Sequence, residues 1–295
     1  MPYFQRNENI SLFYTDEGEK TAAVILLIHG LTCDVHDWSW QVPFLLEKGF
    51  RVISADTRGH GQSSAPAPTP DITEWPGPDA DTSIIDYYPQ TVAYDLVALL
   101  KHLEITSAII MAHSQGDLSA YYIATHAKPE MVRALIGVDP IHHFSNADRE
   151  QTAGFFNEPA KCRDLLLTWF QYSAYTPKSP AWQRAWHQRR AMQQDSLIVH
   201  ALTWGGWGDQ EALARRENAV AVFAGKLKCP RLTIGSSREW VHVDRDLLPK
   251  GSEQDEVILM EEWGHWFNQL DCETFNGHVE TWLTQIGAMP VVEDA

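Results

Sequence analysis

The stretch Ala112-His113-Ser114-Gln115-Gly116 decides how this chain folds, because it places a serine at the end of an apolar run and between two small residues. The apolar run covers residues 108–111, and a helix-like segment follows Gly116. This order predicts a nucleophile elbow, a turn from strand to helix so sharp that only small side chains fit around the serine, whose hydroxyl is held above the edge of a sheet. The sequence therefore first predicts an enzyme that depends on Ser114.

Short apolar segments recur on both sides of the elbow and predict the strands of a sheet. They cover residues 22–28, 50–55, 108–112, 134–138, 231–235 and 256–260. Ahead of them, alternating apolar residues at Ile10, Leu12 and Tyr14 predict an antiparallel edge hairpin. Because helix-length segments separate the apolar runs, we expect an α/β fold with a mostly parallel, eight-stranded sheet and flanking helices.

Two stretches interrupt the alternation of strands and helices. Residues 66–89 are rich in proline and predict a long loop that overhangs the active site. Residues 141–225 contain helix-like segments but no clear strand, and they predict a helical lid inserted after the sixth strand. The predicted domains are therefore a core of residues 1–140 and 226–295 and a lid of residues 141–225.

The composition limits the class of partner. The 295 residues carry a formal net charge of −16, which repels phosphate backbones and anionic lipid and argues against nucleic acid and membrane partners. The start of the chain shows no secretory signal, and the longest apolar run is too short to cross a bilayer. The four cysteines lie far apart and predict reduced thiols. We expect a cytoplasmic protein acting on a small molecule, with the oligomeric state left open.

Four motifs in order make the chain resemble the α/β-hydrolase superfamily over almost its whole length. They are His29-Gly30-Leu31-Thr32 after the first buried strand, the segment from Asp56 to Ser63 after the next, the Ser114 elbow, and Gly264-His265 near the C-terminus. The chain departs from the family pattern at Ala112, where the elbow more often has glycine. The resemblance implies a lid-bearing serine esterase or lactonase. The sequence has no glycine-rich nucleotide-binding motif and no helix-spaced pair of metal ligands, so we expect no cofactor and no metal.

The same resemblance implies the partners of the serine. A serine hydroxyl is a poor nucleophile without a base, and His265 stands where the family places that base. A carboxylate that orients the histidine usually follows the seventh strand, which makes Glu239 the first candidate. Asp139, at the end of the sixth predicted strand, is the second candidate. Asp244 and Asp246 are expected on the surface.

Binding groups follow from the same reasoning. The resemblance puts the main-chain amides of Leu31 and Gln115 where they would bind the negative charge that develops on a carbonyl oxygen. Twelve tryptophans predict either ordinary core packing or an aromatic-lined pocket for a bulky substrate. The candidate pocket residues are Gly30, Trp38, His113, Trp182, Trp186, Trp204 and Trp266.

The leading hypothesis is hydrolysis of a carboxylic ester or lactone of a bulky hydrophobic or aromatic molecule through an acyl-enzyme, with some similarity to zearalenone-type lactonases. One alternative is a cofactor-independent dioxygenase of the quinolone type, in which a histidine and an acid deprotonate an aromatic heterocycle. That group shares the H-S-x-G elbow, but this chain departs from it at Leu31-Thr32-Cys33. A second alternative is a ligand-binding receptor with little turnover.

Overall fold

The computed structural model describes residues 2–151 and 158–290 of the chain. Its centre is an eight-stranded sheet with the order β1-β2-β4-β3-β5-β6-β7-β8. The strands are β1 (Tyr3–Gln5), β2 (Ser11–Glu17), β3 (Val24–Ile28), β4 (Arg51–Ala55), β5 (Ala108–His113), β6 (Val132–Val138), β7 (Arg231–Gly235) and β8 (Glu256–Leu259). Strands β1 and β2 are antiparallel to their neighbours and the others pair in parallel, so the predicted α/β fold with a mostly parallel sheet is confirmed.

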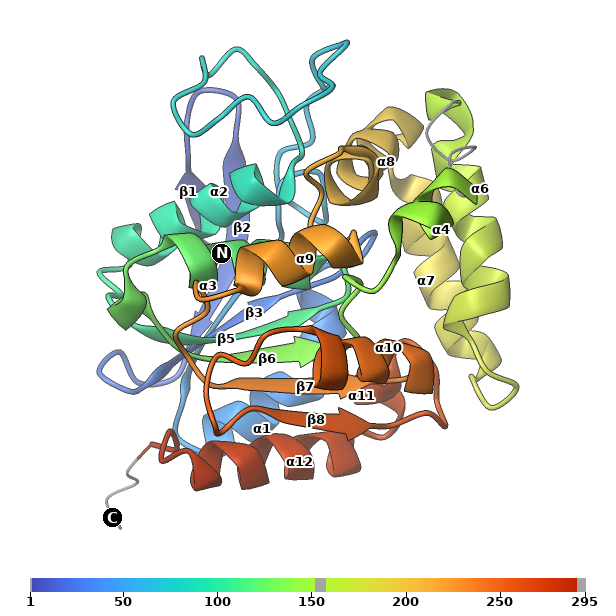
Figure 1. Ribbon diagram of the computed structural model, residues 1–295. Coiled ribbons are helices and arrows are strands. Elements are labelled where there is room, and N and C mark those ends of the chain that lie inside the picture. Colours follow the sequence, from blue (N-terminus) through green and yellow to red (C-terminus); the bar gives the residue numbers. More distant parts are fainter. Residues whose placement is uncertain (1, 152–157, 291–295) are drawn as a thin grey trace.

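The central strands are apolar on both faces because helices cover both faces of the sheet (Figure 1). Every residue of β3, β4 and β5 is buried. Along β3, Leu26 and Ile28 belong to one core cluster, while Ile25 and Leu27 belong to the cluster on the opposite face. This alternation follows from the pleat of a strand, which turns successive side chains to opposite faces.

The helices form one layer on each side of the sheet. The helices α2 (Pro89–His102), α3 (Gly116–His126) and α9 (Arg216–Phe223) pack on one face, and α1 (Gln41–Glu47) and α12 (Cys272–Gln285) pack on the other. Shorter helical segments are η1 (Val35–Trp38), η2 (Pro129–Met131), α10 (Arg238–His242), η6 (Val243–Leu247) and α11 (Phe267–Leu270). Parallel pairing brings the carboxyl ends of β3, β5, β6 and β7 to a single edge of the sheet, where loops carry the functional side chains.

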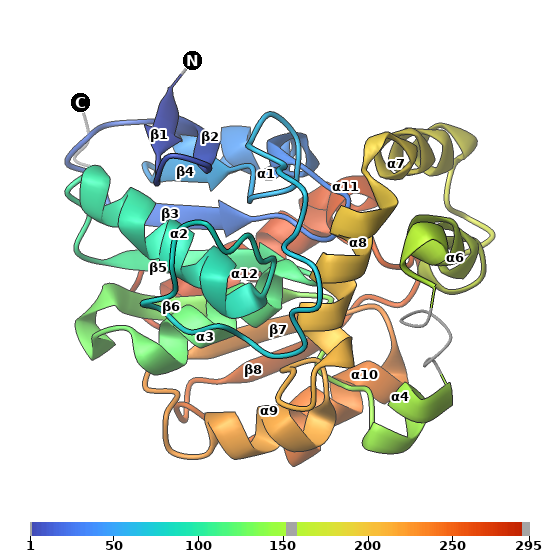
Figure 2. The same cartoon turned by 90° about the horizontal axis from the view of Figure 1, so that it is seen from above.

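A group of helices between β6 and β7 lies beside that edge (Figure 2). It consists of α4 (Asn146–Gln151), η3 (Pro159–Lys161), α6 (Cys162–Trp169), η4 (Phe170–Ala174), α7 (Ala181–Gln193), α8 (Ser196–Thr203) and η5 (Trp204–Gly208). Within the described part of residues 141–225 the only strand-like pairing is an isolated bridge between Phe144 and Arg215. The last helix of that range, α9, instead packs on the sheet, since Ala219 and Phe223 belong to the core with α2 and α3.

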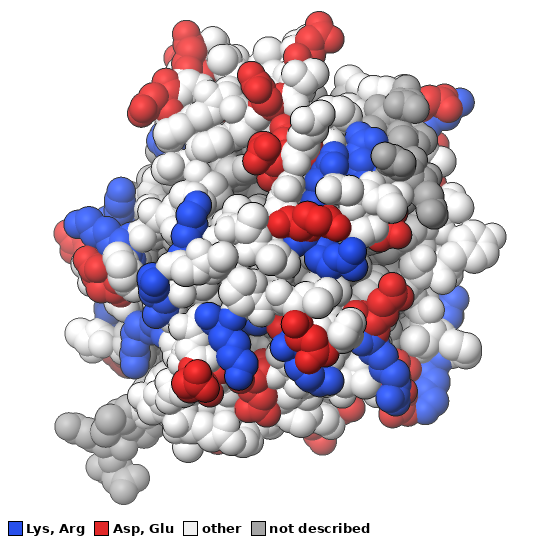
Figure 3. All heavy atoms as spheres, in the orientation of Figure 1, with Lys and Arg blue, Asp and Glu red and all other residues white. Residues whose placement is uncertain are grey.

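The proline-rich stretch contains neither helix nor strand between residues 56 and 88, in agreement with the predicted loop. Part of it faces α8 across a groove of about 380 Å³. On the face shown in Figure 3, this loop region at the top carries mainly acidic side chains, while acidic and basic side chains are interspersed lower down. In the described ranges, no helix combines the length and the apolar character that crossing a membrane requires.

Candidate active site

Ser114 lies at the sharp turn between β5 and α3. Its backbone has φ of +55°, in the left-handed region that a side chain other than glycine rarely adopts, and its amide donates to Val138 O at 2.9 Å. Two residues later, a Cβ on Gly116 would lie only 2.5 Å from the carbonyl oxygen of His29. The turn therefore requires glycine at position 116, because helix α3 starts directly against the end of β3.

His265 is the direct partner of the serine. Its Nε2 lies 2.8 Å from Ser114 Oγ, although 151 positions separate the two residues in the sequence. The backbone amide of His265 donates to Ala174 O at 2.9 Å, which helps to hold the histidine in place. Gly264 permits this approach, since it has φ of +76° and a Cβ there would lie 2.6 Å from the same carbonyl oxygen. The structure thus brings together the two residues that the motifs indicated.

Asp139 completes the hydrogen-bonded series. Its Oδ2 lies 2.5 Å from Nδ1 of His265, and the carboxylate also accepts hydrogen bonds from the amide and the hydroxyl of Ser236 at 2.6 and 2.8 Å. Complete burial on its own would raise the pKa of Asp139, but the hydrogen bonds from His265 and Ser236 outweigh burial and lower that pKa. An ionised Asp139 keeps the proton of His265 on Nδ1 and leaves Nε2 free to accept the serine proton.

The preference for Glu239 is corrected by this arrangement. Glu239 lies exposed in the first turn of α10, and among the described residues it is Asp139 that bonds to His265. The reason is the pairing of β6 with β7, which brings the two strand ends side by side. The position just after β7 belongs to Ser236, whose backbone and hydroxyl bind Asp139.

The expectation for the two other acids holds for one of them only. Asp246 is exposed and pairs with His242. Asp244, in contrast, is 3% exposed and accepts hydrogen bonds from His142 and from the hydroxyl of Thr233. The placement of Asp244 on the surface was wrong because segment η6 turns this side chain inward against β7.

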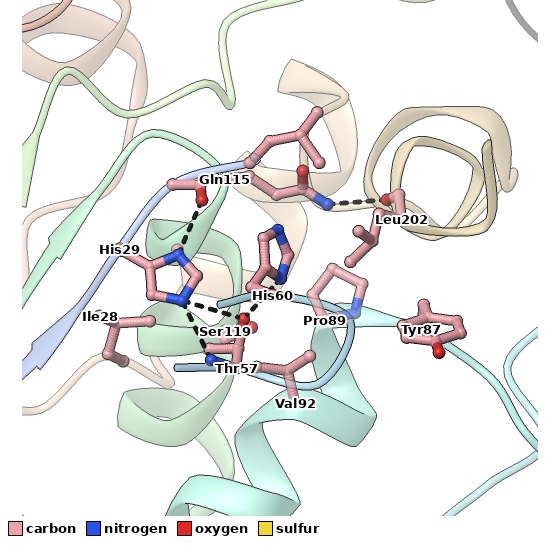
Figure 4. A pocket seen from close by; sticks show the side chains of 13 residues that line it. Ile28, His29, Thr57, His60, Tyr87, Pro89, Val92, Gln115, Ser119 and Leu202 are labelled. Carbon is pink, nitrogen blue, oxygen red and sulfur yellow. Dashed lines mark hydrogen bonds between the residues drawn. The ribbon is translucent and has the colours of Figure 1, made fainter. Parts of the chain in front are cut away.

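Gln115 directly follows Ser114, and Leu31 follows Gly30, where a Cβ would lie 3.0 Å from Ser114 Cβ. Within the described ranges neither amide donates to a protein acceptor, and both residues are buried. Leu31 lies in a turn that Cys33 N closes by donating to Gly30 O at 3.2 Å, and the Gln115 side chain donates to Leu202 O of α8 at 2.7 Å. Both residues line a water-sized cavity of about 20 Å³. Figure 4 shows Gln115 there, together with His60 and Leu202.

Three of the candidate pocket residues lie beside the serine and histidine. A Cβ on Gly30 would lie 3.0 Å from Ser114 Cβ, and the rings of His113 and Trp266 lie with their centres 4.6 and 5.0 Å from the His265 ring. His113 Nε2 donates to the main-chain oxygen of His265 at 2.9 Å. Burial lowers the pKa of His113 to about 3, so this ring is neutral near pH 7.

The other four tryptophan candidates do not surround His265. Trp38 belongs to the core between the sheet and helices α1 and α12. Trp182 is half exposed on α7 with Trp186 beside it, and Trp204 faces the proline-rich loop and donates to Thr73 O at 3.3 Å. Helix α7 turns Gln183, His187 and Ala191 inward instead, so its tryptophans fall on a different face.

Several residues near His265 were missed because nothing in their local sequence marks them. Trp240 meets the His265 ring edge-to-face with ring centres 6.4 Å apart. Tyr175 and Phe170 contact Trp266, with ring centres 5.3 and 5.4 Å away. These residues lie in segments far apart in the sequence, and only the packing of η4 and α10 against the loop of His265 brings them together.

One cluster of potential metal ligands lies nearby. The ligand atoms of Cys33, Asp37 and His187 all lie within 4.8 Å of one another, and all three side chains are buried. The guanidinium of Arg190 already contacts each of them, with Nη2 at 2.8 Å from His187 Nδ1 and at 3.0 Å from Asp37 Oδ1. A cation is thus supplied by the chain itself, and the cluster does not fit a resident metal ion.

Comparison with known proteins finds a matching family model and similar sequences. A sequence model described as the alpha/beta hydrolase fold matches residues 23–171, half of the chain. A bifunctional esterase/perhydrolase of Acinetobacter calcoaceticus is 32% identical over 137 residues, which cover 46% of this chain and 44% of that protein. The matched segment spans less than half the length of these curated relatives, including two non-heme haloperoxidases.

Solved structures extend the likeness to nearly the whole chain. An esterase of Exiguobacterium antarcticum superimposes with a TM-score of 0.74 at 19% identity, covering 96% of this chain and 98% of that chain. The enol-lactonase of Burkholderia xenovorans LB400 gives 0.71 at 20% identity, covering 96% of this chain and 100% of that one. The TM-scores show that the fold is shared, and at identities this low the likeness shows the fold alone.

Proposed function

This chain belongs to the alpha/beta hydrolase family, and on that premise we propose that it hydrolyses a carboxylic ester or lactone of a hydrophobic or aromatic small molecule. The observation that carries the proposal is the uninterrupted series of hydrogen bonds from Ser114 through His265 to Asp139. An esterase/perhydrolase, an esterase and an enol-lactonase are among the similar proteins and support the same class of reaction.

The geometry supports a two-step reaction. Nε2 of His265 takes the hydroxyl proton of Ser114 while Oγ attacks the carbonyl carbon, and the amides of Leu31 and Gln115 bind the oxygen that becomes negative. His265 then gives that proton to the leaving oxygen, the bond between the carbonyl carbon and that oxygen breaks, and the acyl group stays on Ser114. In the second step His265 takes a proton from water, the hydroxide adds to the acyl carbon, and Ser114 leaves with the proton.

Two features of the surroundings support an apolar substrate of limited size. The side chains packed around His265 are aromatic: the rings of Trp240 and Trp266 contact it, and Tyr175 stacks on Trp266. Ser114 and His265 are only 7% and 4% exposed, so substrate reaches them beneath the helices that follow β6. We propose that these helices, chiefly α6, α7 and α8, act as the lid of the site.

The test is a panel of aryl esters and lactones assayed with the wild-type protein, Ser114→Ala and His265→Ala. Removing the nucleophile or its base is expected to lower kcat by about 10⁴-fold or more, because the remaining groups only bind and polarise the carbonyl. Circular dichroism of each variant checks that the fold is kept. Wild-type turnover in Ser114→Ala on the best substrate would rule out the acyl-enzyme route.

A second function is favoured by one observation, the position of Asp139 after the sixth strand. The cofactor-independent quinolone dioxygenases resemble this chain in their elbow and in an acid at the end of the sixth strand. In that reaction His265 and Asp139 would remove a proton from a hydroxylated aromatic heterocycle, and Ser114 would form no bond. Oxygen uptake with a hydroxyquinolone, retained by Ser114→Ala, would establish this function instead of ester hydrolysis.

A further inference from the structure

One arginine of helix α7, Arg190, connects this helix to the segment that contains the Leu31 amide. Arg190 donates to both carboxylate oxygens of Asp37, at 2.6 and 3.0 Å, and its Nη1 lies 3.2 Å from Asp34 Oδ1. The ion pair is sheltered, since the side chains of Arg190 and Asp37 are 11% and 2% exposed. Such paired, parallel hydrogen bonds fix the orientation of both groups.

Hydrogen bonds connect Asp37 to the backbone turn that contains Leu31. The amide of Asp34 donates to Asp37 Oδ2 at 3.1 Å, and the preceding residue, Cys33, closes the turn onto Gly30 O. The same Cys33 has its sulfur 3.6 Å from Arg190 Nη2. Arg190 therefore contacts both the turn and the short helix η1 that follows it.

Helix α11, which directly follows the loop of His265, contacts the same ion pair through Gln269. Gln269 Nε2 donates to Asp37 Oδ1 at 2.6 Å, and Gln269 Oε1 lies 3.3 Å from His187 Nε2. Since a carboxylate only accepts, the orientation of the Gln269 amide is determined, and His187 must donate from Nε2. Its Nδ1 then accepts from Arg190 at 2.8 Å, which closes a ring of four side chains.

The ring of four side chains reaches His265 through one aromatic contact. The imidazole of His187 stacks on Trp266 with ring centres 3.8 Å apart and an angle of 20°. Trp266 directly follows His265, and its main-chain oxygen accepts from the amide of Gln269 at 3.1 Å. Burial, the largest effect, lowers the pKa of His187 to about 3, so the ring keeps the neutral form that these hydrogen bonds require.

We propose that Arg190 is a positioning residue for the reaction, which holds the Leu31 turn and the His265 loop at a fixed separation through Asp37, Gln269 and His187. The inference rests on the proposed function. It means that α7 is the fixed part of the proposed lid, so any opening of the lid involves α6 and α8. A shift of about 1 Å between an oxyanion donor and a base is enough to cost roughly 100-fold in rate.

The experiment compares Arg190→Ala with Arg189→Ala, its exposed neighbour on the same helix. We expect Arg190→Ala to lower kcat by roughly 10- to 100-fold while KM changes much less, because the groups that act in the transition state are displaced. Added guanidinium or methylguanidinium ion, at concentrations that leave the wild type folded, is expected to restore part of kcat. Arg189→Ala should keep wild-type values.

A second variant and a second measurement keep the outcome clear. Arg190→Lys retains the charge and the fold but loses the paired hydrogen bonds, so we expect a kcat between those of wild type and Arg190→Ala. The low-field proton resonance of the His265–Asp139 hydrogen bond reports the geometry without any substrate, and it should broaden or shift in Arg190→Ala and Arg190→Lys. An unchanged resonance and unchanged kcat in folded Arg190→Lys would overturn the positioning role.

Failure of the proposed function gives a different result. If the wild type hydrolyses no ester or lactone, the function is wrong, and the resonance still measures whether Arg190 positions His265. Equal losses of kcat in Arg190→Ala and Arg189→Ala would also contradict the inference, since they would show a general weakening of α7.

Discussion

Asp139 shows how one carboxylate becomes the partner of a histidine while another in the same neighbourhood does not. It follows β6 with a left-handed backbone, φ of +47°, that directs its side chain toward His265, and Ser236 supplies two further hydrogen bonds. Glu239 has no such support and lies in solvent. The distinction depends on the orientation of single side chains rather than on the type of residue.

The variants Asp139→Asn and Glu239→Gln test this assignment. The amide of asparagine cannot stabilise a charged His265, so we expect Asp139→Asn to lower kcat by about 10⁴-fold, whereas Glu239→Gln should leave kcat unchanged. Steady-state kinetics on the best ester, with thermal unfolding of each protein as a control, provides the measurement. A comparable loss of kcat in Glu239→Gln would return the acid to the position after β7.

Among the elements, the close crossing of β3 and α3 determines where the oxyanion amides lie. Gly116 begins α3 against the carbonyl oxygens of Ile28 and His29, and a Cβ there would approach them to 2.8 and 2.5 Å. The amide of Gln115 precedes this contact and Leu31 follows the end of β3. Any separation of the two elements therefore moves one proposed oxyanion donor away from the other.

Gly116→Ala tests that contact, with Gly277→Ala as the matched control. The methyl group at position 116 must push backbone apart, so we expect a loss of about 1–3 kcal/mol in the free energy of unfolding together with a lower kcat. Gly277 lies within α12 and a Cβ there meets no atom within 4 Å, so alanine should stabilise the protein by up to about 1 kcal/mol. Urea unfolding measures both, and a neutral Gly116→Ala would show that the crossing tolerates more space.

The whole molecule contains a set of buried histidines that are neutral in the folded state. Burial is the largest cause that lowers the pKa of His113, His143 and His187 to about 3, and it lowers the pKa of His60 well below its usual value. In the unfolded chain these rings titrate near pH 6.5. Below that pH the unfolded chain therefore binds protons that the folded protein excludes.

The free energy of unfolding is accordingly expected to fall as the pH decreases from 7 to 5. Each buried histidine contributes a loss of up to about 1.4 kcal/mol per pH unit between its two pKa values. Urea unfolding at pH 7, 6 and 5 measures how steeply the free energy of unfolding depends on pH. His143→Gln removes one of these groups, so the number of protons taken up on unfolding should be smaller by about one. A free energy of unfolding that stays constant over this range would contradict the neutral state of these rings.

Local patterns predicted the fold, and the family resemblance of the motifs implied the pairing of Ser114 with His265. Apolar runs, an elbow with small residues around a serine and a glycine before a late histidine act over a few positions, so they are legible along the chain. The choice of Asp139 over Glu239, the inward face of α7 and the ring of Asp37, His187, Arg190 and Gln269 were decided only in three dimensions. They depend on which strand ends are neighbours and on how the helices are rotated against the core. Such contacts join residues that are far apart in the sequence, so no local sequence pattern indicates them.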